Sequence, residues 1–236
     1  MLCLAVSLGS SNQPEIAPLP GTTALHDPQE IVKRLNDKFQ LIHDARADFK
    51  LETSLQIFGC AGSQWQAGEL LFKAPDNIKI RINGYTYIFK GNFGRRFDPD
   101  GKEYWVRFVH APDFSIGFHP GLLSHNFYLT IIKDDPAEII MEGLPKPGVL
   151  KNVNKVTFHI DPREDLLRSM DISFHNVFIS GRAAIDYEKV NDLWVPISTY
   201  GKSAFEPRSG FLIGFSFKLI GSNFKINTDI PTSEFN

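Results

Sequence analysis

Apolar and polar positions follow two different periods along the chain. In the first, apolar residues recur at spacings of four, four and three: Ile31, Leu35, Phe39 and Ile42. These spacings place the four residues on one face of a helix. Asp27 can cap this helix, and Pro28 suits its first position. The pattern therefore predicts an amphipathic helix from Pro28 to His43.

The second period is two. From residue 47 to residue 57, apolar residues or Thr alternate with polar and charged ones, which is typical of a strand with one buried face. Similar segments predict ten further strands, at 65–73, 78–82, 85–90, 103–109, 155–160, 167–175, 177–190, 193–201, 211–220 and 223–227. Short links such as Asn83-Gly84 favour hairpins, so we expect an antiparallel meander.

The middle of the chain interrupts this order. Residues 120–132 are predicted to form a short apolar helix. Residues 135–148 contain three Pro and two Gly, which predicts an irregular segment apart from a turn of helix near 137–141. We therefore expect an insertion lying over one sheet.

The predicted fold class is mainly β with an α lid. A curled antiparallel sheet of about eleven strands, a half-open barrel, would wrap around the N-terminal helix and the short middle helix. Residues 25–236 are expected to form this single domain. Residues 1–24 are interpreted as a shortened, signal-like leader and tether, because an apolar run from Leu2 to Leu8 precedes small polar residues. The alternative is a disordered leader.

Charge and composition narrow the function. The 25 Lys and Arg nearly balance 27 Asp and Glu, for a net charge of -2, whereas a nucleic-acid-binding protein has a strongly basic face. The 20 Phe bring apolar area without a polar group, which indicates a large dry surface. The seven His lack the spacing of metal ligands, and no catalytic motif is present. We expect no metal, no cofactor and no enzymatic activity.

Three stretches resemble one family. Residues 68–75 (GELLFKAP) are similar to the Gly-acid-Leu-aromatic-apolar-Lys-Arg-Pro segment of the LolA/LolB-type outer-membrane lipoprotein carriers. Residues 187–196 (YEKVNDLWVP) and 224–235 (FKINTDIPTSEF) resemble a hairpin and the C-terminal segment of related lipoprotein-sorting proteins. The resemblance implies a periplasmic half-open barrel with a helical lid and a cavity for acyl chains.

The chain departs from this family at Ala74. The carriers have an Arg there that points into the cavity and helps the lid to open and close. A general lipid-binding protein, or a sensory relative of the RseB type, therefore fits as well as a lipoprotein shuttle.

We expect the inward face of the sheet to hold the ligand. The predicted cavity residues are Phe49, Leu51, Leu55, Ile57, Leu70, Phe72, Ala74, Ile78, Ile80, Ile82, Phe215 and Phe217. The predicted lid residues are Ile31, Leu35 and Phe39. A well-packed core without a cavity is the alternative. Arg95 and Arg96 allow two interpretations, a site for an anionic head group or a solvated pair of charges.

The expected function is non-catalytic binding or transport of a lipid or lipoprotein acyl chain in the periplasm or cell envelope. The partner would be a lipid or an acylated protein, and we expect the protein to be a monomer that meets the membrane only indirectly. The alternative is an envelope sensor or assembly factor of the same fold that binds a protein partner.

Overall fold

The computed structural model describes residues 26–57, 60–90, 93–107, 120–148, 153–174, 179–205 and 213–236. The leader expected over residues 1–24 lies outside them. The strands are β1 (Asp44–Ile57), β2 (Cys60–Lys73), β3 (Asn77–Ile82), β4 (Tyr85–Lys90), β5 (Phe93–Phe97), β6 (Glu103–Arg107), β7 (Phe127–Asp135), β8 (Glu138–Pro145), β9 (Val153–Asp161), β10 (Leu166–Phe174), β11 (Ile179–Val190), β12 (Leu193–Phe205) and β13 (Ile213–Ile226). The helices are α1 (Pro28–Gln40), α3 (Leu122–Asn126) and the short 3-10 helix η1 (Thr232–Phe235).

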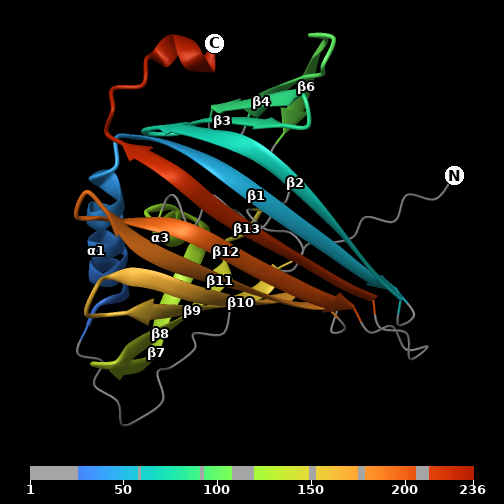
Figure 1. Ribbon diagram of the computed structural model, residues 1–236. Coiled ribbons are helices and arrows are strands. Elements are labelled where there is room, and N and C mark those ends of the chain that lie inside the picture. Colours follow the sequence, from blue (N-terminus) through green and yellow to red (C-terminus); the bar gives the residue numbers. More distant parts are fainter. Residues whose placement is uncertain are drawn as a thin grey trace, which may run out of the picture.

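Within these residues the strands form one antiparallel sheet. Its order is β6-β5-β4-β3-β2-β1-β13-β12-β11-β10-β9-β8-β7. Strands that follow one another in sequence are neighbours in the sheet, except β6 and β7, which form its two edges. The first and last strands, β1 and β13, pair with each other in the centre. The curled sheet stays open, which confirms the expected mainly-β fold. Figure 1 shows α1 crossing one end of the strands, while β1, β2 and β13 extend well beyond it.

The expected strand number was too low, and the predicted helix over 120–132 is confirmed only at α3. Residues 127–135 and 138–145 are not helix and irregular chain but the paired strands β7 and β8. Pro136 lies in the turn between them, where the Asp135 carboxylate accepts a hydrogen bond from the Ala137 N–H at 2.8 Å. The middle segment therefore extends the sheet instead of lying over it. The sequence reading also missed β5 and divided β13 into two strands.

Helix α1 begins where the sequence predicts and ends three residues earlier, at Gln40. The Asp27 carboxylate caps it by accepting the Gln29 N–H at 2.9 Å. Its buried residues Ile31, Val32 and Leu35 join a core with side chains of β7 to β11.

Polar contacts hold the first half of α1 against the same strands. The His26 N–H donates to the Asp134 carboxylate of β7 at 2.9 Å, and the Arg34 guanidinium lies 3.4 Å from the Asp165 carboxylate in the β9–β10 turn. The first half of the helix is therefore fixed to one side of the sheet.

The C-terminal segment packs on the side of the sheet opposite α1. Ile230 and Phe235 form a core cluster there with Leu71 and Ile88. Lys79 is buried beside them, and its Nζ donates to the Glu234 backbone carbonyl at 2.6 Å and to the Glu234 carboxylate at 3.1 Å.

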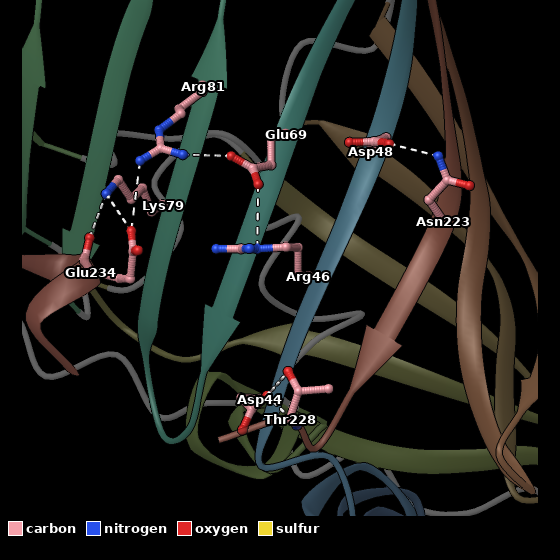
Figure 2. Close-up of polar contacts among 9 residues, drawn as sticks. All are labelled: Asp44, Arg46, Asp48, Glu69, Lys79, Arg81, Asn223, Thr228 and Glu234. Atoms are coloured by element: carbon pink, nitrogen blue, oxygen red, sulfur yellow. Dashed lines mark hydrogen bonds and ion pairs between the residues drawn. The ribbon is translucent and has the colours of Figure 1, made fainter. Parts of the chain in front are cut away.

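Salt bridges extend this contact across the outer face. The Arg81 guanidinium joins the Glu234 carboxylate to that of Glu69, which also meets Arg46 at 3.3 Å (Figure 2). The outer face of β2 to β4 is thus covered by the chain's own end. Among the described residues, no helix is both long and apolar enough to cross a membrane.

Candidate functional site: an apolar pocket on the inner face

We call the side of the sheet that carries α1 the inner face. Residues directly paired across strands point to the same side, so the register assigns faces. It places these predicted cavity residues on the inner face: Phe49, Leu51, Leu55, Leu70, Phe72, Ile78, Ile80, Ile82, Phe215 and Phe217. The backbone of Ile57 continues β1, and its side chain lies outside what the structure describes.

A hollow of about 50 Å³ lies on this face at the C-terminal end of α1. It is lined by Phe39, Ile42, Ala45, Ala47, Phe49, Leu70, Phe72, Val195, Pro196, Ile197, Ser198, Thr199, Leu219, Gly221 and Phe224. Thr199, which is paired with the inner-face residue Leu219, brings a polar side chain to this lining. We call this hollow the inner pocket.

The inner pocket includes only part of the predicted set. Phe49, Leu70 and Phe72 line it from the sheet, and Phe39 lines it from the helix. Sequence reasoning missed the contribution of β12, from Val195 to Thr199. Its signal was weak because β12 carries an extra residue, Ile197, between the partners of Asp186 and Tyr187, and this residue breaks the period of two.

The predicted lid residues fall into two groups. Ile31 and Leu35 belong to the core packed on β7 to β11. Phe39, one to two turns later, packs beside Phe72 of β2, with 5.8 Å between ring centroids in an edge-to-face arrangement. Only the last turn of α1 therefore closes the pocket.

Ala74 lies outside the pocket. Strand β2 ends at Lys73, and Ala74 stands exposed in the following turn, where its N–H donates to the His43 carbonyl at 2.8 Å. The alternation through Leu70 and Phe72 therefore does not continue to Ala74. Lys73 points to the outer face as expected, where its Nζ donates to the Ile230 carbonyl.

An exposed apolar surface continues from the pocket toward the far ends of β1 and β13. Leu51 is paired with Leu219, and further along Leu55 is paired with Phe215. Leu55 is 47% exposed and Phe215 is 44% exposed. Phe217 lies between these pairs, 6.5 Å from the Phe215 ring centroid. The inner face thus offers an open apolar track leading to the pocket.

Glycines opposite Phe residues shape this track. Phe217 is paired with Gly201 and Phe49 with Gly68. A Cβ on Gly201 would come within 2.2 Å of the Phe217 ring, and one on Gly68 within 2.5 Å of the Phe49 ring. Each ring therefore lies flat over the glycine of the neighbouring strand. The rings then rise little above the sheet, and the pocket side of the sheet stays open.

The junction between α1 and β1 is tied to the end of β13. The buried Asp44 carboxylate accepts the backbone N–H groups of Thr228 at 2.9 Å and Asp229 at 3.0 Å. The Asn227 side chain accepts the His43 N–H at 2.8 Å and donates to the Leu41 carbonyl at 2.9 Å. These bonds fix the point at which the chain leaves the helix next to the pocket (Figure 2 shows Asp44 with Thr228).

Titratable groups cluster on the outer face instead. His159 of β9 lies between two carboxylates, with Nδ1 3.0 Å from Glu138 and Nε2 3.0 Å from Asp171. The hydrogen bond from His159, supported by one from Lys133, holds the pKa of Glu138 below its usual value. Among the described residues, no three His, Cys, Asp or Glu side chains are arranged to hold a metal ion. His110, Asp113 and His119 lie outside those residues.

No protein-family model and no curated protein sequence matches this chain. Solved structures match its fold. A putative outer membrane lipoprotein-sorting protein domain from Vibrio parahaemolyticus superposes with a TM-score of 0.63 at 13% identity, over 88% of this chain and 95% of that one. A LolA superfamily protein from Nitrosomonas europaea gives 0.58 at 13% identity, over 88% and 96%.

The chain has the fold of the LolA superfamily. A DUF1329 family protein from Desulfovibrio piger shares it, with a TM-score of 0.62 at 12% identity over 88% of this chain and 95% of that one. The family resemblance seen in the sequence is therefore confirmed at the level of the fold. At 12–13% identity, these likenesses show the fold alone.

Proposed function

We propose that this LolA-like protein binds the acyl chain of a lipid or lipoprotein on its inner face, without catalysis, in the periplasm or cell envelope. It would act as one domain over residues 25–236 and as a monomer. The observation that carries the proposal is the inner pocket, an almost wholly apolar hollow between the last turn of α1 and strands β1, β2, β12 and β13. Such a lining favours a ligand without polar groups along its length.

The apolar track supports an elongated ligand. Soluble proteins seldom leave adjacent large apolar side chains exposed unless they meet a partner or ligand. Leu55 and Phe215 are such a pair, and they lie on the same face as the pocket. An acyl chain lying along β1 and β13 would cover both and continue into the pocket.

The size of the pocket implies movement at its helical side. Ligand pockets commonly enclose about 300–1,000 Å³, whereas the inner pocket holds about 50 Å³. Phe39 is half-buried and sits on the last helical turn, beyond the salt bridges that fix the first half of α1. Displacement of the Phe39 ring is therefore the simplest way to admit a chain.

Two measurements on the purified full-length protein test this proposal. Mass spectrometry of an organic extract from protein isolated from its native host should identify co-purified acyl lipids. A fluorescent long-chain fatty acid should bind saturably and be displaced by unlabelled lipid. Absence of both signals would contradict the proposal. Selective recovery of one envelope protein from a pull-down, without lipid binding, would favour the sensor or assembly-factor alternative.

A further inference from the structure

One row of inner-face residues joins the pocket to the β6 edge of the sheet. In register across β1 to β6, the row reads Ala47, Leu70, Ile80, Tyr87, Arg96 and Tyr104. Ala47 and Leu70 line the inner pocket. Neighbouring strands lie about 4.8 Å apart, so three strand steps place Arg96 roughly 14 Å from Leu70. From Leu70 to Arg96, the row changes from aliphatic to aromatic and then to cationic with distance from the pocket, and Tyr104 follows at the edge.

The Arg96 guanidinium is held by aromatic rings. Its central carbon lies 4.6 Å from the ring centroid of Tyr104 on β6 and 5.6 Å from that of Tyr85 on β4. The faces of these rings attract a cation and restrict its orientation. The rings do not neutralise its positive charge, because a ring quadrupole carries no net charge.

Arg96 differs in this respect from the comparable arginines of the described chain. Among the described residues, the Nε atoms of Arg34, Arg46 and Arg96 are buried without a hydrogen bond. Arg34 Nε lies 3.4 Å from the Asp165 carboxylate, and Arg46 Nε lies 3.3 Å from the Glu69 carboxylate. Within the described ranges, no carboxylate lies at ion-pairing distance from Arg96. A partly buried charge without a partner is unfavourable, so this position favours an external anion.

The neighbouring residue gives a contrast on the same strand. Arg95 points to the outer face, where its guanidinium lies over the Phe97 ring and 3.9 Å from the Glu103 carboxylate. Of the two interpretations of this Arg pair, that of a solvated charge describes Arg95, which also has Glu103 as a counterion. The anionic-group interpretation remains for Arg96.

We infer that Arg96 is the subsite for the anionic head, a carboxylate or phosphate, of an amphiphile whose acyl chain occupies the inner pocket. Arg binds both groups well, because its planar fork can donate two parallel hydrogen bonds to two oxygens. The apolar-to-cationic row matches the order of the parts of such a ligand. This inference rests on the proposed function.

The test compares a fluorescent long-chain fatty acid with its methyl ester, which has the same chain and no charge. Both are titrated into the wild type, Arg96→Gln, Arg96→Lys and the outer-face control Arg95→Gln. The wild type should bind the acid about tenfold more tightly than the ester, the scale of one charge-assisted hydrogen bond. Arg96→Gln should lose that preference while still binding the ester, and Arg95→Gln should keep it.

The other outcomes separate the claims. Equal binding of acid and ester by the wild type, or an unchanged preference in Arg96→Gln, would overturn the head-group subsite and leave the acyl-binding proposal standing. Failure of the wild type to bind either probe would overturn both. If Arg96→Gln does not fold, Arg96→Lys decides: it keeps the charge but loses the planar fork, so the preference should fall in part, and a preference equal to that of the wild type would overturn the subsite. Calorimetric binding of inorganic phosphate as tight as that of the acid would mark a site for a free anion and contradict the head-group assignment.

Discussion

The Phe39 ring of α1 meets the Phe72 ring of β2 edge to face, with 5.8 Å between their centroids. This contact joins the last turn of the helix to the wall of the inner pocket. Four residues earlier on the same helical stripe, Leu35 is fully packed in the core on β7 to β11. The helix is thus an anchored element whose C-terminal end alone covers the pocket.

Phe39→Ala should open the pocket at a modest cost in stability. Because the ring is half-buried, we expect a loss of about 2 kcal/mol in unfolding free energy, less than for a fully buried Phe, together with faster exchange of a bound fatty-acid probe. Leu35→Ala is the matched control, with an expected loss of about 2–5 kcal/mol and no acceleration of exchange. Chemical denaturation and stopped-flow probe release measure the two effects. Equal exchange rates in both variants would contradict the assignment of Phe39 as the cover.

Gly201→Ala should disturb the apolar track. The new Cβ would meet the Phe217 ring at 2.2 Å, so the ring must move, at an expected cost of about 1–3 kcal/mol. Gly62 lies on the inner face of β2, opposite Leu55, and a Cβ there meets nothing within 4 Å. Gly62→Ala should therefore be neutral or slightly stabilising. Thermal midpoints of the two variants test the contrast, and a destabilised Gly62→Ala with an unaffected Gly201→Ala would reverse it.

Leu70→Arg and Ala74→Arg test the register of β2. Leu70 lines the pocket, and a cation placed there without a partner should lower the unfolding free energy by about 2 kcal/mol or more and abolish probe binding. Ala74 is exposed in a turn, so an Arg there should reach water and change stability by no more than about 0.5 kcal/mol. A large effect at Ala74 would mean that its side chain faces the pocket after all.

Asp44→Asn should weaken the junction between α1 and β1. The buried carboxylate accepts two backbone N–H groups and the Thr228 hydroxyl, and an amide nitrogen cannot accept in place of an oxygen. We expect a loss of about 1–3 kcal/mol. On the same strand, Asp48 accepts a hydrogen bond from Asn223 on the exposed outer face at 2.7 Å, and Asp48→Asn should cost no more than about 0.5 kcal/mol. Equal losses in the two variants would count against a special role for Asp44.

The contact of Glu234 with Lys79 should make stability depend on acid pH. The hydrogen bond from Lys79 lowers the pKa of Glu234 from its ordinary value of 4.5. The folded state therefore binds its proton less readily than the unfolded state, and the contribution is present above pH 4.5 and lost as the pH falls through the folded-state value. Denaturation of wild type and Glu234→Gln across this range should show a stability difference that shrinks in acid. A difference that stays constant would contradict this linkage.

Local signals sufficed for much of the fold. The Asp27 cap and the Ile31 to Ile42 stripe predicted α1, and the alternation in β1 predicted the inner face because Leu51 and Leu55 keep its period of two. The pattern does not predict the strands β7 and β8, because Pro136 indicates a break in regular structure, whereas it occupies the hairpin turn. The alternation of the buried residues Ile139 and Met141 was the available signal.

The pocket itself depends on contacts that no short segment contains. Leu71 is fully buried on the outer face because the C-terminal segment, more than 150 residues later, folds over it. The need for Gly201 follows only from its pairing with Phe217 on the next strand. Likewise, Arg95 and Arg96 look alike in the sequence, and only the register separates the paired outer charge from the one facing inward.

Photo-crosslinking tests the central claim most directly. A long-chain fatty acid carrying a diazirine at its apolar end is irradiated with the purified protein, and the labelled residues are mapped by mass spectrometry, with acid-unfolded protein as the control. We expect labels on the pocket wall, at Phe39, Leu70, Phe72 and Val195, and along the track near Leu55 and Phe215, which excess unlabelled fatty acid suppresses. Labels confined to the outer face, or no labelling above that of the unfolded control, would contradict acyl binding on the inner face.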